Sequence, residues 1–396
     1  MDKSIGLACN ISTGKLDANQ AVSGGAYPFF TCAEHPDQID HYAYDDDVVL
    51  VAGNNARGNF HVSRFKGKFN AYQRTYILTA KDGYDIDYIY YALKLELKRL
   101  REKAQGSQTK FLTMPILTGI HFRNITGLEQ SEIASVLSKI DKKIELNNRI
   151  NAELEAMAKT LYDYWFVQFD FPDTNGNPYK TSGGKMVYNS TLKREIPEGW
   201  EALPLSKHLD CNRKKLGKKH NLKTLNYLDT ANLTNNIVGS IQKLEVDVDN
   251  IPSRANMLVS KNDILYSTVR PNQLHYGILK DPIENMIAST GFAVLTHKAD
   301  SELNVIFYLH ITSSQNTSRL IKISESSKSS YPSISPDDIL NLTIALPSES
   351  KILTRFCELL NPFFEKVSEV QKENNELEKL RDWLLPMLMN GQVTVK

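Results

Sequence analysis

Two short stretches contain residue types that enzymes acting on DNA use for catalysis. Asn177-Pro178-Tyr179 is similar to the loop with which adenine methyltransferases hold a flipped base, but one proline is missing and no Gly-rich cofactor loop follows a strand. Glu96-Leu97-Lys98, downstream of Asp85 and Asp87, imitates the acidic and lysine residues of metal-dependent nucleases. Such nucleases need carboxylates that converge on one metal, whereas Glu96 and Lys98 fall in a helical pattern. We interpret the first stretch as a linker turn and the second as a solvated helix.

The histidines and cysteines do not form a recognisable catalytic or metal-binding pattern. The nine histidines lack HExxH or other ligand spacing, and the four cysteines lack CxxC spacing: Cys9, Cys32, Cys211 and Cys357. The sequence has no signal-like N-terminal stretch and no apolar run that approaches a membrane span. We therefore expect a cytoplasmic protein with reduced thiols, no metal and no cofactor of its own.

Cationic side chains give a stronger indication, of contact with nucleic acid. The densest basic segment runs from Asn212 to Lys223 without an acid and contains Arg213, Lys214, Lys215, Lys218, Lys219 and His220. Cations that neutralise phosphates release counterions, so this segment predicts salt-dependent, sequence-independent affinity. The comparable set in the first half is Arg57, Arg64, Lys66, Lys68 and Arg74, interleaved with Phe65, Phe69 and Tyr72. The alternative is a solubilising loop in the second half and core aromatics in the first.

Side chains able to read bases follow one predicted strand in each half. Asn54, Asn55 and Arg57 lie in a Gly-bounded loop, and Arg270, Asn272 and Gln273 follow the equivalent strand of the second half. Arginine can bind guanine, and Asn or Gln can bind adenine, through paired hydrogen bonds. Asn near Gly is also ordinary turn chemistry, which remains the alternative for each residue. The formal net charge of +1 neither supports nor excludes binding to DNA.

A long helix is predicted over residues 129–171, which hold no Gly or Pro. Its apolar seam is Ile133, Leu137, Ile140 and Ile144, then, after a slip at Asn147-Asn148, Ile150, Leu154, Met157, Leu161 and Trp165. Buried Asn in paired helices weakens packing but fixes register. A helix of this length cannot be buried by its own small domain and needs a partner helix.

The C-terminal stretch supplies that partner. Its seam is Ile352, Phe356, Leu359, Phe363, Val367, Val370, Asn374, Leu377, Leu380 and Leu384. We expect a kink or restart at Pro362 with Asn361 as N-cap, and an end at Pro386 and Gly391.

The two halves of the chain repeat one another with an offset of roughly 216 to 220 positions. The matched segments are Asp47–Leu50 with Asp263–Tyr266, Tyr76–Leu78 with Ala293–Leu295, Ile86, Ile89 and Tyr91 with Leu303, Ile306 and Tyr308, and Gly106–Thr109 with Ser326–Ser329.

We expect an α+β protein with a first globular domain at 1–128, a first long helix at 129–171, a linker at 172–199 with a hairpin around Asn175-Gly176, a second domain at 200–347 and a second long helix with a tail at 348–396. The first half lacks the opening Ile196–Trp200, so the chain starts late relative to its repeat.

Antiparallel pairing of the two helices would relate the globular domains by a pseudo-twofold axis. Such a protein could contact two separated places on one long, pseudo-symmetric ligand, and duplex DNA fits because its major grooves recur every ~34–36 Å.

The sequence resembles the specificity subunit of type I restriction–modification systems almost throughout. The resemblance is carried by the duplicated order and by Leu161–Asp170, Ile196–Trp200, Tyr331–Ile334 and Leu380–Pro386. It implies two target recognition domains that each read half of a split DNA sequence, with the helices as spacer and docking surface for two methyltransferase subunits. Motor-nuclease restriction subunits join outside, and S-adenosylmethionine, magnesium and ATP belong to those partners. Catalysis therefore lies in other subunits.

An aromatic tract ends the first helix and has two interpretations. Tyr162, Tyr164, Trp165 and Phe166 are more than one seam can bury, so they could dock a partner or close the helix onto the second domain. Two other functions remain as alternatives for the whole chain: a coiled-coil scaffold that binds only protein, and a methyltransferase or nuclease in its own right.

Overall fold

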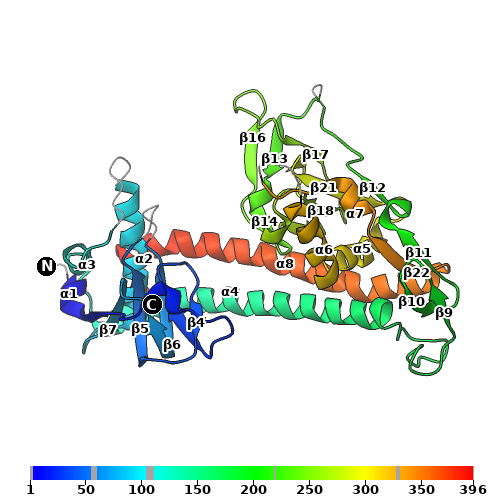
Figure 1. Ribbon diagram of the computed structural model, residues 1–396. Helices are drawn as coiled ribbons and strands as arrows, with labels where there is room; N and C mark the ends of the chain where they lie inside the picture. Colours follow the sequence, from blue (N-terminus) through cyan, green and yellow to red (C-terminus); the bar gives the residue numbers. More distant parts are fainter. Residues whose placement is uncertain (1–2, 55–59, 104–110, 218–219, 327–330, 396) are drawn as a thin grey trace. The chain divides into compact units, whose positions relative to one another are not determined.

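The computed structural model describes residues 3–54, 60–103, 111–217, 220–326 and 331–395 (Figure 1). The chain divides into two compact units: unit 1 comprises Met1–Glu145 and Asn375–Lys396, and unit 2 comprises Leu146–Asn374. Each unit contains sheet and helix, which confirms the expected α+β class. Among the described helices, none combines the length and apolar character needed to cross a membrane.

Unit 1 is built on a six-stranded sheet with the order β2-β7-β5-β6-β3-β4. These strands are β2 (Cys9–Thr13), β7 (Thr75–Ala80), β5 (Tyr44–Ala52), β6 (Val62–Ala71), β3 (Tyr27–Phe30) and β4 (Asp37–Ile39). The central strand β5 is buried on both faces, since Val49 and Val51 pack on the core that includes helix α2 (Ile86–Lys103), while Val48 and Leu50 pack on Phe69. Alternation with period two explains why four consecutive apolar residues are all buried. Short elements α1 (Ile5–Ala8) and α3 (Met114–Thr118) flank a pair formed by β1 (Lys3–Ser4) and β8 (His121–Phe122).

Unit 2 contains two four-stranded sheets. The first has the order β12-β21-β18-β19, with β12 (Leu209–Cys211), β21 (Phe292–His297), β18 (Ile264–Ser267) and β19 (Tyr276–Ile278). The second has the order β16-β13-β20-β17, with β16 (Gln242–Glu245), β13 (Thr224–Leu228), β20 (Met286–Ser289) and β17 (Ala255–Leu258). Three separate two-stranded sheets pair β9 (Met186–Asn189) with β10 (Arg194–Pro197), β11 (Trp200–Pro204) with β22 (Thr343–Pro347), and β14 (Leu233–Thr234) with β15 (Ile237–Val238). Helices α5 (Asn304–Ile311), α6 (Ser314–Glu325) and α7 (Pro336–Leu340) lie between β21 and β22 in the chain.

The repeat predicted from the sequence is present in the strand register. Val49 of β5 pairs with Leu78 of β7, and Leu265 of β18 pairs with Val294 of β21, so both members are displaced by 216 positions. The order β2-β7-β5-β6 in unit 1 corresponds to β12-β21-β18-β19 in unit 2. The matched helical segments are also helices, α2 and α5, whereas the proposed match of Gly106–Thr109 with Ser326–Ser329 falls largely outside the described residues. Each unit therefore contains the same arrangement of four strands, to which it adds strands of its own.

The two long helices are α4 (Gly127–Tyr162), continued by the π-helical turn η2 (Asp163–Val167), and α8 (Ser350–Met389). The restart expected as one possibility at Pro362 does not occur, because α8 continues through Pro362 and Pro386 to Met389. The Asn361 side chain does not cap a helix; its Oδ1 accepts a hydrogen bond from Lys280 Nζ at 2.7 Å. Packing of Leu360 and Phe364 in the unit 2 core compensates for the ladder bond that Pro362 removes.

The helices pair antiparallel through polar as well as apolar contacts. In unit 2, Asn147 Nδ2 donates to Asn374 Oδ1 and Asn374 Nδ2 donates to Asn148 Oδ1, both at 2.8 Å. Further along, the rings of Trp165 and Phe356 lie 5.1 Å apart, so the partner number falls as the number on α4 rises. In unit 1, Arg381 Nη1 of α8 lies 2.9 Å from Asp141 Oδ1 of α4. The buried asparagines thus occupy the register-fixing position that the sequence predicted.

The seam beyond these asparagines lies on a different face of α4 from the predicted one. Ile150 and Met157 are 36% and 50% exposed, whereas the buried positions are Asn151, Ala158 and Tyr162, together with Trp165, which the predicted seam included. Leu359 and Leu380 of α8 are likewise exposed. The error arose because Asn147 was assumed to interrupt the seam, whereas it is itself a seam residue and the helical spacing continues from it without a slip.

Replacing Asn374 with Ala should lower the free energy of unfolding by about 1–3 kcal/mol, since it leaves the buried Asn147 amide with only Glu373 Oε2 as acceptor. Replacing Asn147 and Asn374 together with Leu removes both partners, so this double variant should be more stable than Asn374→Ala. Denaturant unfolding followed by circular dichroism measures both. A double variant no more stable than the single one would contradict direct pairing of these amides.

Candidate nucleic-acid interface

The polar loop that follows β5 in unit 1 is held by backbone hydrogen bonds on both sides. Gly53 N donates to Arg74 O at 2.8 Å, and Leu112 N donates to Gly53 O at 3.0 Å. Asn54 forms an antiparallel bridge with Phe111, and the Arg74 guanidinium lies 5.8 Å from the Phe111 ring centre. The structure therefore brings the half-buried Asn54 and the exposed Arg74 together at the end of β5. Asn55 and Arg57, which the sequence also proposed, lie outside the described residues.

The same arrangement recurs after β18 in unit 2. Thr268 N donates to Gly291 O, and Ile334 N donates to Thr268 O, both at 2.9 Å. Val269 forms an antiparallel bridge with Ser333, as Asn54 does with Phe111. The polar loops that follow β5 and β18 therefore occupy equivalent places in the repeat.

The unit 2 loop presents three polar side chains from a defined backbone. Arg270, Asn272 and Gln273 are exposed, and the 3-10 turn η5 (Pro271–Gln273) places them on adjacent positions. Arg270 and Leu274, at the two ends of η5, both have left-handed backbone conformations, with φ of 50° and 56°. Non-Gly residues keep such conformations only where the surroundings impose them. Here Arg270 N donates to Pro332 O at 2.8 Å, so the Tyr331–Ile334 turn supports the loop.

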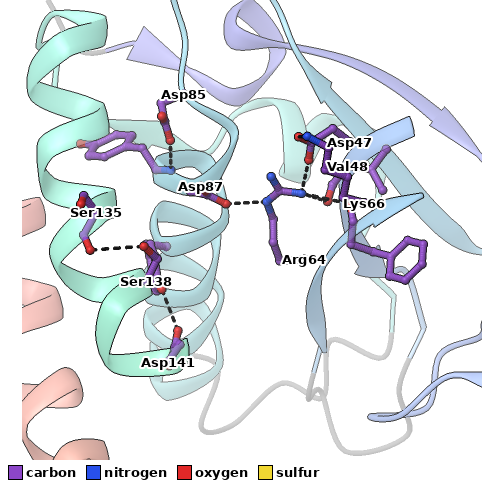
Figure 2. Close-up of polar contacts among 12 residues, drawn as sticks. Asp47, Val48, Arg64, Lys66, Asp85, Asp87, Ser135, Ser138 and Asp141 are labelled. Carbon is purple, nitrogen blue, oxygen red and sulfur yellow. Dashed lines mark hydrogen bonds and ion pairs between the residues drawn. The ribbon is translucent and has the colours of Figure 1, made fainter. Parts of the chain in front are cut away.

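The cationic residues predicted in unit 1 are not equivalent to one another. Arg64 is half-buried and pairs with Asp47 and Asp87, while its Nη1 donates to Val48 O and Phe65 O at 3.2 and 3.0 Å (Figure 2). Burial opposes both shifts, but the carboxylates of Asp47 and Asp87 raise the pKa of Arg64, and the cations of Arg64 and Lys66 lower the pKa of Asp47. Arg64 therefore joins the sheet to α2, and its placement in a DNA-contacting set was wrong.

Lys66 and Lys68 remain exposed on β6. Lys66 Nζ lies 3.5 Å from Asp47, and Lys68 Nζ lies 4.5 Å from the Tyr42 ring centre. Lys66 pairs with Asp47 in the strand register. Asp47 is seven residues before Asn54 in the chain, and seven residues span roughly 20 Å along a strand. The structure therefore does not gather these lysines with Asn54 and Arg74.

The basic segment of unit 2 follows β12 and crosses to the second sheet. Arg213, Lys214 and Lys215 are exposed; Lys214 O accepts from Leu258 N at 3.1 Å, and Lys215 bridges to Met257 of β17. Arg213 Nε lies 3.7 Å from Asp210 Oδ2. Lys218 and Lys219 lie outside the described residues.

The two basic sets stand beside equivalent carboxylates. Burial raises the pKa of Asp263, which precedes β18, while the charges of Lys214 and Arg213 act in the opposite direction. Asp263 is 216 positions beyond Asp47, the partner of Lys66. In each unit, cations therefore lie near the start of the central strand, and the polar loop lies at its end.

The aromatic tract at the end of α4 belongs to the core of unit 2. Tyr162, Trp165 and Phe166 are buried, and Tyr164 packs against the same cluster. The Tyr162 hydroxyl lies 2.8 Å from His310 Nδ1, and burial lowers the pKa of His310 to about 4. Of the two interpretations, closure onto the second globular part describes these side chains; the partner-binding assignment was wrong for Tyr162, Trp165 and Phe166, whose surface is already covered, while Tyr164 is half-buried.

The stretches similar to catalytic motifs have structural contacts. Asp85 Oδ1 accepts from Tyr88 N at 2.8 Å, Asp87 binds Arg64, and Glu96 pairs with Arg99. The Tyr179 ring stacks on Phe171 with centres 4.7 Å apart. Across the part of the chain that the structure describes, no group of three potential His, Cys, Asp or Glu metal ligands occurs.

Comparison with known proteins finds sequence similarity to type I restriction specificity proteins. The family model described as the type I restriction modification DNA specificity domain matches residues 2–156. The specificity subunit of the type I restriction enzyme EcoDI of Escherichia coli is 29% identical over 67% of this chain, and that of MjaIX of Methanocaldococcus jannaschii is 26% identical over 80%. The chain is therefore similar in sequence to specificity subunits of type I restriction enzymes. The alignments span 61% and 71% of those two relatives.

A solved structure shares the fold. The S subunit of the type I restriction–modification system of M. genitalium matches with a TM-score of 0.61 at 15% identity, over 98% of this chain and 96% of that one. The likeness supports the architecture of two sheet units and long helices rather than any individual contact.

Two contributors to the interface were missed by sequence reasoning. Pro332 was noted only as part of a family turn, although its carbonyl holds Arg270. His275 was not considered, although its Nε2 lies 3.2 Å from Gln273 Oε1. His275 stands two residues after Gln273 in the sequence, which is a local signal. Pro332 is distant in the chain, and the fold brings it to the loop.

Proposed function

We propose that this chain is the non-catalytic subunit that recognises a bipartite DNA target for a type I restriction–modification complex. The observation that carries the proposal is the duplicated polar loop, fixed after β5 and after β18 by equivalent backbone hydrogen bonds. A pair of equivalent reading loops in one chain suits two half-sites on one duplex. Asn54, Arg74, Arg270, Asn272 and Gln273 supply the donors and acceptors that base edges require.

The basic sets are proposed to contact phosphates rather than bases. Lys66, Lys68 and Arg213–Lys215 are exposed but lie toward the start of the central strands, away from the loops. Phosphate contacts fix position and orientation on a duplex without sequence information. Asn55, Arg57, Lys218 and Lys219 stay in the proposed interface on their sequence positions alone.

The proposed domain organisation follows the repeat. Residues 1–128 and 200–347 form the target recognition domains, 129–171 and 348–396 form the spacer helices with the C-terminal tail, and 172–199 link the two halves. The helix pair sets the spacing of the half-sites. Methyl transfer, DNA cleavage and translocation belong to partner subunits, which bring S-adenosylmethionine, magnesium and ATP.

Replacing Arg213, Lys214 and Lys215 with Ala should weaken binding to every duplex, because phosphate contacts carry no sequence information. The slope of log affinity against log salt should fall in magnitude by roughly 2 to 3, as expected for three lost contacts. Fluorescence anisotropy with specific and random duplexes over a salt series measures this change. The matched control replaces three exposed α4 lysines, Lys139, Lys142 and Lys159. Equal slopes for both triple variants would exclude a phosphate role for the basic segment.

The helix pair is also proposed to dock methyltransferase subunits, two of them in the complete complex, with restriction subunits joining outside. An exposed apolar stripe on α4 supports this: Leu146, Ile150 and Met157 are 42%, 36% and 50% exposed and share one helix face. These residues replace the aromatic tract as candidates for the contact, since exposed apolar faces on helices mark interaction sites.

Replacing Met157 with Asp should reduce co-purification of the methyltransferase subunit at least severalfold, because a charge would be buried against the partner. DNA affinity of the isolated chain should stay unchanged. Val248→Asp, at another exposed apolar position of unit 2, is the control. Full methyltransferase recovery with Met157→Asp would remove the stripe from the docking surface.

A further inference from the structure

His275 makes hydrogen bonds on both sides of its ring, and one of them reaches a proposed base-reading side chain. Its Nδ1 lies 2.8 Å from Leu233 O and 2.9 Å from the Thr234 hydroxyl of β14. Its Nε2 lies 3.2 Å from Oε1 of the terminal amide of Gln273. The ring itself is half-buried, whereas Gln273 is exposed.

The chemistry of these partners fixes where the proton sits. A carbonyl oxygen only accepts hydrogen bonds, so the contact with Leu233 O requires a proton on Nδ1. The ring atoms have only neutral partners in these hydrogen bonds, namely a carbonyl, a hydroxyl and an amide. A neutral ring with Nδ1 protonated has a bare Nε2, which can only accept.

A bare Nε2 in turn determines the orientation of the Gln273 amide. The NH2 group must face Nε2, and Oε1 must then point away from the ring; the oxygen and nitrogen ends of the amide exchange by rotation about its last bond. The backbone supports this pairing, because Gln273 N donates to Arg270 O at 2.9 Å and Ser267 N donates to His275 O at 2.8 Å. The two residues are thus fixed at the same end of the loop.

We propose that His275 is a positioning residue that holds the Gln273 amide with Oε1 outward, so that Gln273 reads a base carrying an exocyclic amino group. This inference rests on the proposed DNA-recognition function. An outward carbonyl oxygen accepts from N6 of adenine or N4 of cytosine and has no donor for O6 and N7 of guanine. An amide free to rotate would discriminate less, because it could offer either end.

The test uses the two amides that imitate different halves of imidazole. In His275→Asn, the amide can replace Nδ1 toward Leu233 but leaves Gln273 without a partner. In His275→Gln, the longer side chain can replace Nε2 and keep the partner of Gln273. Selection of bound sequences from a random duplex library, with the full chain, reports the base preference at each position. Thermal unfolding checks that each variant is folded.

The wild-type chain should show one position with a preference for adenine or cytosine of about 5- to 150-fold, which Gln273→Ala removes. His275→Asn should remove it as well, and His275→Gln should retain it. Gln273→Asn, at an exposed position where folding is not at risk, keeps an amide too short to reach Nε2 and should also relax the preference.

Three results would overturn the inference: an unchanged preference in His275→Asn, a preference for guanine or thymine at the position that Gln273→Ala relaxes, or no position affected by Gln273→Ala. Should His275→Asn fail to fold, an unchanged preference in Gln273→Asn overturns it instead. A wild-type chain that selects no sequence at all would be a failure of the proposed function itself, and is distinguished in this way from failure of the His275 assignment.

Discussion

Register between α4 and α8 is the constraint on which the other features of this protein depend. Apolar seams in paired helices tolerate sliding by a turn, because one aliphatic side chain can replace another. The hydrogen bonds among Asn147, Asn148 and Asn374 are satisfied in one register alone, and the ion pair of Asp141 with Arg381 has the same antiparallel sense. Buried polar groups in such positions cost stability and provide specificity of alignment.

Duplication gives each unit the same means of presenting a variable loop. The register of β5 with β7 and of β18 with β21, and the clamps on Gly53 and Thr268, are common to both units. The exposed side chains beyond these clamps are different, with Asn54 in one unit and Arg270, Asn272 and Gln273 in the other. A buried strand thus fixes where the loop begins, and the loop sequence is free to set what is recognised.

The elements that sequence reasoning found are those with strong local patterns. The apolar residues of Asp47–Leu50 predict a strand, and their repetition in Asp263–Tyr266 predicts the second sheet core. The register-fixing role of the asparagines was also foreseen, since Asn147 and Asn374 are polar residues beside apolar seams. These patterns are visible because burial requires apolar side chains at regular spacing.

The errors concern contacts made by residues distant in the chain. Arg64 is a cation among other cations in the sequence, which is typical of a DNA-contacting residue. The ion pair with Asp87 of α2 instead gives Arg64 a structural role. Pro362 should break a helix, yet packing on both sides maintains it. The orientation of Gln273 depends on His275 and, through it, on Leu233, forty residues earlier. Local propensity cannot report such tertiary contacts.

Insertion of four residues into both helices, after Glu145 in α4 and after Asn374 in α8, tests most directly whether the helix pair sets the spacing of the target. Both polar contacts stay within their units in this variant, and each helix lengthens by about 6 Å. Sequence selection from random duplexes should return unchanged half-sites with a spacer longer by about two base pairs, at 3.4 Å of rise per base pair. Altered half-sites, or the original spacer in a folded and DNA-binding variant, would contradict the account.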